Sequence, residues 1–420
     1  MNAALTGLDE LATRWEAALE RQLPAAVRLR HKLHAAPRLS GDEHDTTARM
    51  AEELERVVLF EPVAGAGAVG RVGPIGGHAV AVRAELDALP VTERTGAAFA
   101  AANGAMHACG HDVHQAALTA LLRASAGLDL PVGLVALLQP REESYPSGAL
   151  DVLREGVLER HAIAHVIAAH VHPGVPTGAV AVGGGFINAA ADEIEVLVEG
   201  RGGHGGYPHD GADTVAAIAH IATAIPEVVR RTVAPLNPAV ISVGTLSAGD
   251  GAANVLPASA RLLATMRTTD PADREPLVQA VRTMAERIAE AFGTRATVVR
   301  TEGEPVLVND HALAQGADDW LARLGVDGAE TMRSLGADDF SYFSEAVPSL
   351  MMFAGVETAG EEPQPALHHP RFLPGDEAVG VVARALLAGY LAAAERVLGI
   401  EHHRDGRAHP LSTEPTGAAR

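Results

Sequence analysis

Three histidines, a cysteine and an aspartate stand within eight consecutive positions, in the segment HACGHDVH at residues 107–114. Cys109, the single cysteine of the chain, is separated from His111 by Gly110. In an extended or turning segment, residues two positions apart share a face, so this thiol and this imidazole can bind one ion together. Thiolate and imidazole suit zinc, and added carboxylates also admit manganese or cobalt.

Two other interpretations of this segment stay open. Cys109 can be a thiolate nucleophile activated by His107 or His111, but this chemistry also needs an oxyanion hole and a third orienting group, and the sequence marks neither. Alternatively, the segment is the start of a helix, with Asp112 as its capping residue and solvated histidines.

A pair of adjacent carboxylates, Glu142 and Glu143, indicates hydrolytic chemistry. Adjacent side chains in an extended loop point to opposite sides, so one can bind a metal while the other faces the water on that metal. The metal makes a nucleophile at neutral pH, and the carboxylate takes its proton and returns it to the leaving amine. A solvated helix start is the alternative, because acids are common there.

Alternation of apolar runs and helical patterns predicts an α/β domain, with helices on both faces of a central, mostly parallel sheet. The predicted buried strands are residues 78–84, 132–139, 162–170 and 349–356. The predicted helices between them include residues 112–127 and 147–160.

Polar side chains follow three of these strands where each one ends. They are Glu85 and Asp87 after the first strand, Arg141, Glu142 and Glu143 after the second, and His170 and His172 at the third. Open α/β sheets bind ligands at the carboxyl ends of their strands, so we expect these groups to share one site.

Residues 191–302 have a different pattern, β-α-β-β-α-β, which is typical of a ferredoxin-like α+β domain. Its predicted elements are 192–200, 211–232, 239–249, 258–268, 271–292 and 295–302. A chain of 420 residues also exceeds one ordinary core. We therefore expect a larger three-layer α/β domain in two parts, 1–190 and 303–400, a small α+β domain inserted at 191–302, and a disordered tail at 401–420.

Charge and cysteine content exclude several classes of partner and compartment. The chain carries 33 basic and 53 acidic residues and a net charge of −20, which argues against nucleic acid or an anionic membrane as a partner. No uninterrupted apolar run reaches the roughly 20 residues that span a bilayer. A single cysteine excludes an internal disulfide, and the start of the chain lacks the pattern of a signal peptide. These features predict a soluble cytoplasmic protein.

Nine segments, taken in order, resemble the motifs of the M20 metallopeptidase family, and above all of its amidohydrolase branch. That branch includes N-acyl-amino-acid amidohydrolases, hippurate hydrolases and auxin-conjugate hydrolases. The resemblance runs from about residue 25 to 398. The segments are LRHKLHAAPRLSGDE (29–43), VRAELDALPVTE (82–93), MHACGHDVHQAAL (106–118), QPREESYPSGA (139–149), AAHVHPGVPTG (168–178), GRGGHGGYPHDGAD (200–213), AANVLPASARLLATMRT (252–268), GADDFSYF (336–343) and LHHPRFLPGDE (367–377).

The resemblance implies a centre of two divalent metal ions, zinc, manganese or cobalt. The ligands it implies are Cys109, His111, Glu143, His170 and His368. It makes Glu142 the general base and places Asp87 behind a ligand histidine, which it holds in position. His368 is preferred over its neighbour His369. An ordinary turn residue is the alternative for Asp87.

Three residues of the inserted domain are implied to contact the substrate. His204 resembles a histidine that polarises the scissile carbonyl, often from the partner subunit, while Asn254 and Arg267 resemble residues that hold the substrate carboxylate. The alternatives are turn residues at His204 and Asn254 and a surface ion pair at Arg267. The resemblance also makes this domain a lid over the catalytic, metal-binding domain. One face of its predicted sheet is available for packing and an exposed strand edge invites pairing with another chain, so we expect it to be the dimerisation domain of a homodimer, with hinges near 188–192 and 302–306.

Four positions depart from the family pattern, and none of them removes an implied ligand. The family usually has Asp at Glu85, Glu at Arg38, Ala at Arg141 and Gly at Ala264. Arg141 directly precedes the carboxylate pair, where it can shape the acyl pocket, alter the pKa of Glu142 or point to solvent.

The expected activity is metal-dependent hydrolysis of the linear amide bond of an N-acyl or N-aroyl amino acid, giving a carboxylic acid and a free amino acid. Within the same family, a biosynthetic deacylase or a short-peptide hydrolase is the alternative. From another class, the alternative is a catalytically silent binding protein with the same fold.

Overall fold

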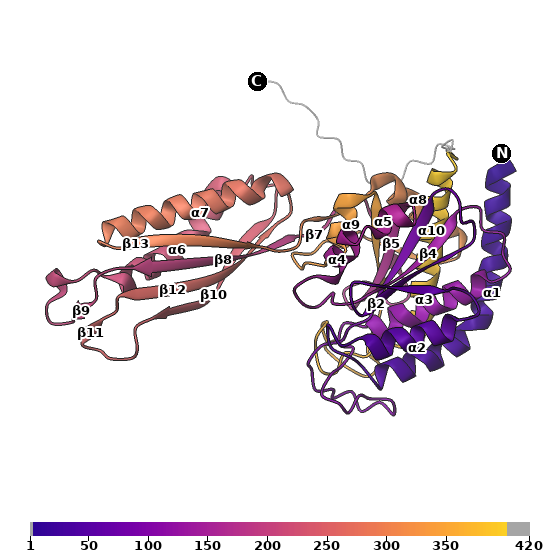
Figure 1. Ribbon diagram of the computed structural model, residues 1–420, viewed down its shortest axis with the longest axis horizontal. Helices are drawn as coiled ribbons and strands as arrows, with labels where there is room; N and C mark the ends of the chain where they lie inside the picture. The colour runs from indigo at the N-terminus through magenta and orange to yellow at the C-terminus, as the bar shows by residue number, and fades with distance from the viewer. Residues whose placement is uncertain (1–2, 401–420) are drawn as a thin grey trace, which may run out of the picture.

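The computed structural model describes residues 3–400, and the predicted tail at 401–420 lies outside the described residues. Figure 1 shows two bodies side by side, a large sheet covered by helices on both faces and a smaller sheet with two long helices. The predicted fold class, a large α/β domain with an inserted α+β domain, is confirmed.

The large sheet has eight strands, and its four central strands, β4, β3, β5 and β16, run parallel. Antiparallel pairs join β1 to β2, β2 to β4 and β16 to β6, so the sheet is mixed outside its centre. In spatial order the strands are β1 (Phe60–Val63), β2 (Gly67–Val72), β4 (Gly133–Gln139), β3 (Ala79–Glu85), β5 (Ile163–His172), β16 (Ser349–Gly355), β6 (Val180–Ala181) and β15 (Gly328–Ala329).

Side chains of the central strands alternate between two hydrophobic cores, one on each face of the sheet. On β3, Val80 and Val82 enter the larger core, and Ala79 and Ala81 enter the smaller one. The larger core is closed by α1 (Ala3–His34), α2 (His44–Leu54), α3 (His111–Ser125), α8 (His311–Arg323) and α10 (Ala378–Val397). The smaller core is closed by α4 (Gly148–Arg154), α5 (Val157–Arg160) and α9 (Ser341–Ala346).

The helix predicted at 147–160 is wrong as a single helix. The chain forms α4 and α5 instead, because Gly156 between them has a φ of 69°, a left-handed conformation that ends a helix.

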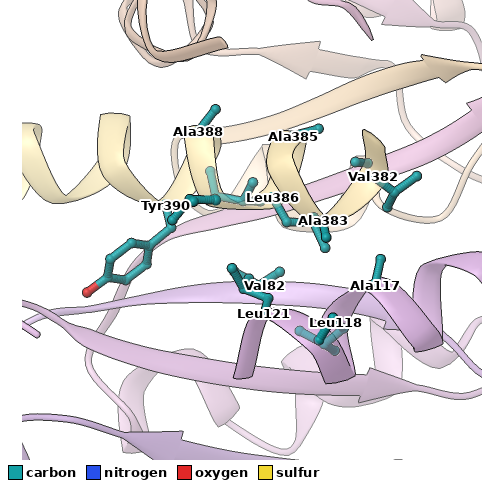
Figure 2. Close-up of a cluster of buried hydrophobic side chains, with 14 of the residues drawn as sticks. Val82, Ala117, Leu118, Leu121, Val382, Ala383, Ala385, Leu386, Ala388 and Tyr390 are labelled. Atoms are coloured by element: carbon teal, nitrogen blue, oxygen red, sulfur yellow. The ribbon is translucent and has the colours of Figure 1, made fainter. Parts of the chain in front are cut away.

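Helix α10 is the centre of the larger core. Figure 2 shows its Ala383 and Leu386 opposite Leu118 and Leu121 of α3, with the ring of Tyr390 pointing away from them. By length and composition α10 is apolar enough to cross a membrane, although Arg384 interrupts its run of apolar residues. However, 89% of its most apolar window is buried inside the fold, so it packs as a core helix.

The smaller body is an antiparallel sheet in the order β10-β12-β8-β13, covered on one face by two helices. This strand order and the β-α-β-β-α-β sequence are those of a ferredoxin-like domain. Its elements are β8 (Ala190–Glu199), α6 (Thr214–Thr232), β10 (Ala239–Ala248), β12 (Ser259–Thr268), α7 (Pro271–Ala291) and β13 (Arg295–Glu302). A short ribbon of β9 (Gly203–His204) and β11 (Val255–Leu256) extends from it, with the 3-10 helix η1 (Pro208–Asp210) following β9.

Two chain segments link the bodies, and they lie against each other. The outgoing strand β7 (Gly185–Asn188) pairs with the returning strand β14 (Leu307–Asn309) in an antiparallel ribbon. The smaller body is therefore attached through a paired connection rather than through two independent loops.

Truncation of Leu118 tests the larger core. Leu118 is fully buried, so Leu118→Ala should lower the free energy of unfolding of this domain by about 2–5 kcal/mol. Both tryptophans, Trp15 and Trp320, lie in the same core, so their fluorescence in urea reports this domain. As a control, Leu236→Ala removes a side chain that is 93% exposed and should change stability by less than about 0.5 kcal/mol. Equal shifts in the two variants would contradict this description of the core.

Candidate metal centre

Three parallel strands deliver polar side chains to one edge of the large sheet, as the sequence predicted. Asp87 follows β3, Glu142 and Glu143 follow β4, and His170 lies near the end of β5. The strands β4, β3 and β5 are neighbours, so their carboxyl ends meet there. The fourth contribution comes from the loop that leads into α3.

That loop turns sharply at Gly110, and α3 begins at His111. Gly110 has a φ of 83° and packs against the side chain of Val171, so a larger residue is excluded there on both counts. No side chain caps the helix. The interpretation of Asp112 as a capping residue is wrong, because its carboxylate instead accepts hydrogen bonds from Arg30 and His34 of α1.

The structure brings the five implied ligands together. Cys109 Sγ lies 3.4 Å from His170 Nε2, and Glu143 Oε1 lies 4.0 Å from His111 Nε2. His368 enters from the C-terminal part of the chain, with its Nε2 at 3.4 Å from Glu143 Oε1. Its backbone N–H donates to the Ala108 carbonyl, and its φ of 67° is a strained conformation for a non-glycine residue.

Hydrogen bonds hold two of the histidines with Nε2 facing the cluster. His111 Nδ1 donates to the Asp87 carbonyl oxygen at 2.9 Å, and His170 Nδ1 donates to the Val171 carbonyl oxygen at 2.7 Å. Their Nε2 atoms therefore carry the free lone pairs that a metal requires.

Two buried atoms at the centre of the cluster lack hydrogen bonds. Neither His111 Nε2 nor Glu143 Oε1 has a hydrogen-bond partner among residues 3–400. Burying such atoms unpaired is costly, and a cation between them would satisfy both. Cys109, His111 and Glu143 also offer donor atoms within 4.8 Å of one another. The residues present therefore fit a divalent metal ion.

His114 and Glu85 form a supporting pair that sequence reasoning did not assign. His114 Nε2 accepts from the Val171 N–H at 3.0 Å, so its Nδ1 carries the proton and donates to Glu85 Oε2 at 2.9 Å. The Glu85 carboxylate and the His114 imidazole lie near His111 and His170. Both ring nitrogens of His114 already form hydrogen bonds, so neither is free to bind a metal. The pair thus fixes the end of β5 beside His170. The i, i+3 spacing of His111 and His114 on one helix was the available signal.

Asp87 lies behind the cluster and contacts two of its members. Its carboxylate accepts from the Glu143 N–H at 2.9 Å and from Ser40 Oγ at 2.7 Å, and it lies 3.5 Å from His111 Nδ1. Burial lowers the pKa of His111, but the hydrogen bond to Asp87 and the charges of the nearby carboxylates outweigh burial and bring this pKa to about 10. Without a cation, this site would hold a proton on His111.

For the Cys109 thiol, burial raises the pKa, and the charges of Glu143 and Glu142 raise it further. These surroundings disfavour a free thiolate, which is the form a cysteine nucleophile needs. A cation reverses this effect by stabilising the thiolate.

Glu142 is also close to His111: its Oε2 lies 3.8 Å from His111 Nε2, and its side chain is 11% exposed. Burial, followed by the charges of Asp338 and Glu143, raises the pKa of its carboxyl well above the usual value. Asp338 and Asp339, which sequence reasoning left without a role, approach Glu142 within 4.8 Å. They are separated from Glu142 by almost two hundred positions in the sequence, so no local pattern could have linked them.

Arg83 neutralises part of this acidic surrounding. Its guanidinium is fully buried and forms ion pairs with Glu85, with Asp338 at 3.3 Å and with Asp339 at 2.8 Å. Asp339 also accepts from Ser147 Oγ at 2.7 Å and so fixes the far end of the loop that carries Glu142.

Arg141 turns away from Glu142. Its guanidinium donates to Asp151 Oδ2 at 2.7 Å and to the carbonyl oxygens of Ala64 and Pro146. Its backbone N–H donates to Glu43 at 2.8 Å. Arg141 therefore braces the loop rather than facing the cluster.

The three implied substrate contacts lie in the smaller body. His204 is exposed in the β9–β11 ribbon, at the end of this body far from the large sheet (Figure 1). Asn254 is beside it, with its carbonyl oxygen accepting from the Gly205 N–H at 2.7 Å. Arg267 is half-buried at the opposite end of the small sheet, paired with Ala191 and Val240. Within one chain, the fold does not bring these residues to the metal ligands.

The chain has clear relatives among known proteins. It is 33% identical over 365 residues to N-acetylcysteine deacetylase of Bacillus subtilis, covering 85% of this chain and 94% of that protein. It is 31% identical over 371 residues to N-acetyldiaminopimelate deacetylase of Shouchella clausii, covering 86% and 96%.

A solved structure shares the fold. The crystal structure of the YXEP protein of Bacillus subtilis, described as a dinuclear metal binding peptidase from the M20 family, has a TM-score of 0.78 and 28% identity, and the match covers 90% of this chain and 99% of that one. The model of peptidase family M20/M25/M40 matches residues 81–391. Together with the geometry of the site, these matches identify the chain as a hydrolase that belongs to the peptidase family M20/M25/M40.

Proposed function

We propose that this hydrolase cleaves the amide bond of N-acyl or N-aroyl amino acids, releasing a carboxylic acid and a free amino acid. The observation that carries the proposal is the convergence of five donor side chains directly beside Glu142, two of which present buried atoms without a hydrogen bond among residues 3–400, His111 Nε2 and Glu143 Oε1. Donors for a cation and a carboxylate next to them are what metal-assisted amide hydrolysis requires.

The residues that would hold two divalent ions, zinc, manganese or cobalt, are Cys109, His111, Glu143, His170 and His368. When bound, such ions polarise the amide carbonyl and make water a nucleophile at neutral pH. Asp87 would keep His111 in the tautomer with a free Nε2, and Glu85 with His114 would keep the end of β5 in place.

Glu142 would be the general base and then the general acid. Its carboxylate takes a proton from the attacking water and then gives that proton to the nitrogen of the departing amine. Burial and the charges of Asp338 and Glu143 raise the pKa of Glu142, which makes it a stronger base than an exposed glutamate.

The names of the relatives support small N-acyl amino acids as the substrate class. A biosynthetic deacylase or a short-peptide hydrolase stays the alternative within the family, and a silent binding protein is the alternative from another class. A panel of N-acetyl, N-benzoyl and dipeptide substrates, assayed with metal-reconstituted protein, separates these possibilities. Lack of turnover on the whole panel, with metal content verified, would favour the silent protein.

The remaining residues would complete the site from a second subunit. His204, Asn254 and Arg267 lie in the smaller body, and His204 is exposed and far from the metal ligands of its own chain. The outer strand β10 is largely exposed and free to pair with another copy. We therefore infer a homodimer through this lid domain, with hinges near 188–192 and 302–306. The high net negative charge also supports a cytoplasmic protein without nucleic-acid or membrane partners.

Replacement of Glu142 by glutamine tests the general base. Glu142→Gln should retain metal and lower kcat by about 10²–10⁴-fold, because the amide cannot accept the proton. Initial rates and elemental analysis of the same sample measure both quantities. Glu52→Gln, on the exposed face of α2, is the matched control and should behave as the wild type. Wild-type turnover in Glu142→Gln would exclude this role.

Replacement of Cys109 by serine separates a ligand from a nucleophile. If the thiolate binds metal, Cys109→Ser should weaken metal binding, and excess metal should restore part of the activity. Titration of activity against metal concentration checks this. If the sulfur instead attacks the substrate, no metal concentration restores activity, and mass spectrometry of the wild type with substrate shows an acyl-enzyme.

Mixing two inactive variants tests whether His204 acts across the dimer. In a heterodimer of Glu142→Gln and His204→Ala, one site carries both changes and the other is intact, so activity should return to the mixture. His204→Ala alone should lower kcat more than it raises KM, because the imidazole stabilises the oxyanion. No recovery in a verified heterodimer, or a monomer at assay concentration, would contradict action from the partner.

A further inference from the structure

Tyr145 stands two positions after Glu143, in the loop between β4 and α4 that carries both glutamates, and its side chain is not committed to either hydrophobic core. The residue is 60% exposed, yet its hydroxyl contacts the segment that returns from the lid domain to the large sheet. Burial of that hydroxyl and hydrogen bonding to Glu304 raise the pKa of Tyr145.

The returning segment leaves no room for a side chain at the point of contact. A Cβ atom at Gly303 would lie 2.6 Å from the Tyr145 hydroxyl oxygen and would also overlap the Ala191 carbonyl oxygen. Because glycine has no Cβ, the tyrosine hydroxyl can contact the backbone directly at this position.

This segment is firmly part of the lid domain. The Glu304 carbonyl oxygen accepts from the Ala191 N–H at 3.0 Å, and the Gly303 N–H donates to Asp192 at 3.2 Å. Arg274 of α7 binds the same Asp192 carboxylate through two hydrogen bonds of 2.8 Å and also donates to the carbonyl oxygens of Gly303 and Glu304. Because Arg274 and Asp192 connect it to α7 and β8, the segment moves with the lid.

The loop that carries Glu142, in contrast, is anchored to the large sheet at both ends. The Gly148 N–H donates to the Arg141 carbonyl oxygen at 3.0 Å, Arg141 binds Asp151, and Ser147 binds Asp339. Tyr145 lies between these anchors. Its contact with Gly303 and Glu304 therefore joins the base-carrying loop of one domain to the body of the other.

We propose that Tyr145 is a positioning residue, which ties the loop of Glu142 and Glu143 to the returning lid segment at Gly303–Glu304, so that the orientation of the lid sets the position of the two glutamates. The kinetic consequence rests on the proposed function, but the contact between the domains does not. The tyrosine itself takes no part in proton transfer.

Kinetics of conservative variants test the consequence for the glutamates. Tyr145→Phe keeps the ring and removes the hydroxyl, and it should lower kcat by about 2- to 10-fold, the range of one lost hydrogen bond, with little change in KM. Glu304→Ala, which removes the accepting carboxylate, should do the same, and the double variant should be no worse than either single one, because both remove one contact. Tyr145→Ala should lower kcat further, toward about 10²-fold, as misplaced catalytic groups do.

The matched control is Glu302→Gln, an exposed carboxylate on the same returning segment that pairs with arginines of the lid. It should leave kcat and KM unchanged. Additive losses in Tyr145→Phe and Glu304→Ala, or a rise in KM alone, would overturn the proposal, and the rise in KM would make Tyr145 a substrate contact instead.

A distance measurement tests the contact without any turnover. Spin labels at Leu59→Cys on the large domain and Arg287→Cys on the lid replace exposed residues, while Cys109 is buried. Samples are diluted with unlabelled protein to exclude distances between subunits, and unmodified protein is the control for labelling of Cys109. Tyr145→Ala in this background should widen the distance distribution, and Glu302→Gln should not. An unchanged distribution in Tyr145→Ala overturns the proposal even if hydrolysis is confirmed. A widened one supports the contact even if no substrate is found.

Discussion

Concentration of negative charge in a buried site is the constraint on which this structure depends. Glu85, Glu142, Asp338 and Asp339 lie close together at the edge of the large sheet, and isolated buried carboxylates are strongly unfavourable. One buried cation, Arg83, compensates several of them at once. Even so, burial and the charge of Asp338 raise the pKa of Asp339 to about 7, although Arg83 acts to lower it. The site is therefore built to receive additional positive charge.

The same constraint explains how the supporting parts are arranged. Two buried aspartates fix the orientation of side chains in the cluster: Asp87 holds His111, and Asp339 holds the loop that carries Glu142 through Ser147. Asp87 follows β3, Ser147 lies in the loop after β4, and Asp339 lies just before α9. The order of the strands in the sheet brings these distant parts of the chain together. The strands thus set the positions of the groups at the centre, while the loop after β4 also contacts the smaller body, at Tyr145.

Much of this could be predicted from the sequence, and the successes share a cause. Apolar runs and period-two alternation are local signals, so the strands β3, β4, β5 and β16 and the order of the small domain were predictable to within a few residues. The rule that ligands gather at the carboxyl ends of parallel strands then grouped Asp87, Glu142 and His170. The pairing of Arg83 with Asp338 and Asp339 was not predictable, because it joins positions 255 and 256 residues apart. The break at Gly156 and the orientation of Arg141 depend on left-handed backbone conformations that composition alone does not reveal.

The position of α10 has a consequence for how the chain is made. This helix, residues 378–397, is among the last elements described, yet it packs against α1, α3 and β5 in the middle of the larger core. The smaller body, in contrast, has a separate core formed by residues 190–302 alone. On the ribosome, domains with their own core form as units while synthesis continues. The inserted domain can therefore complete its fold while the surrounding domain still exposes the apolar surfaces of α3 and β5, and that surface stays open to chaperones until residue 397 has left the exit tunnel.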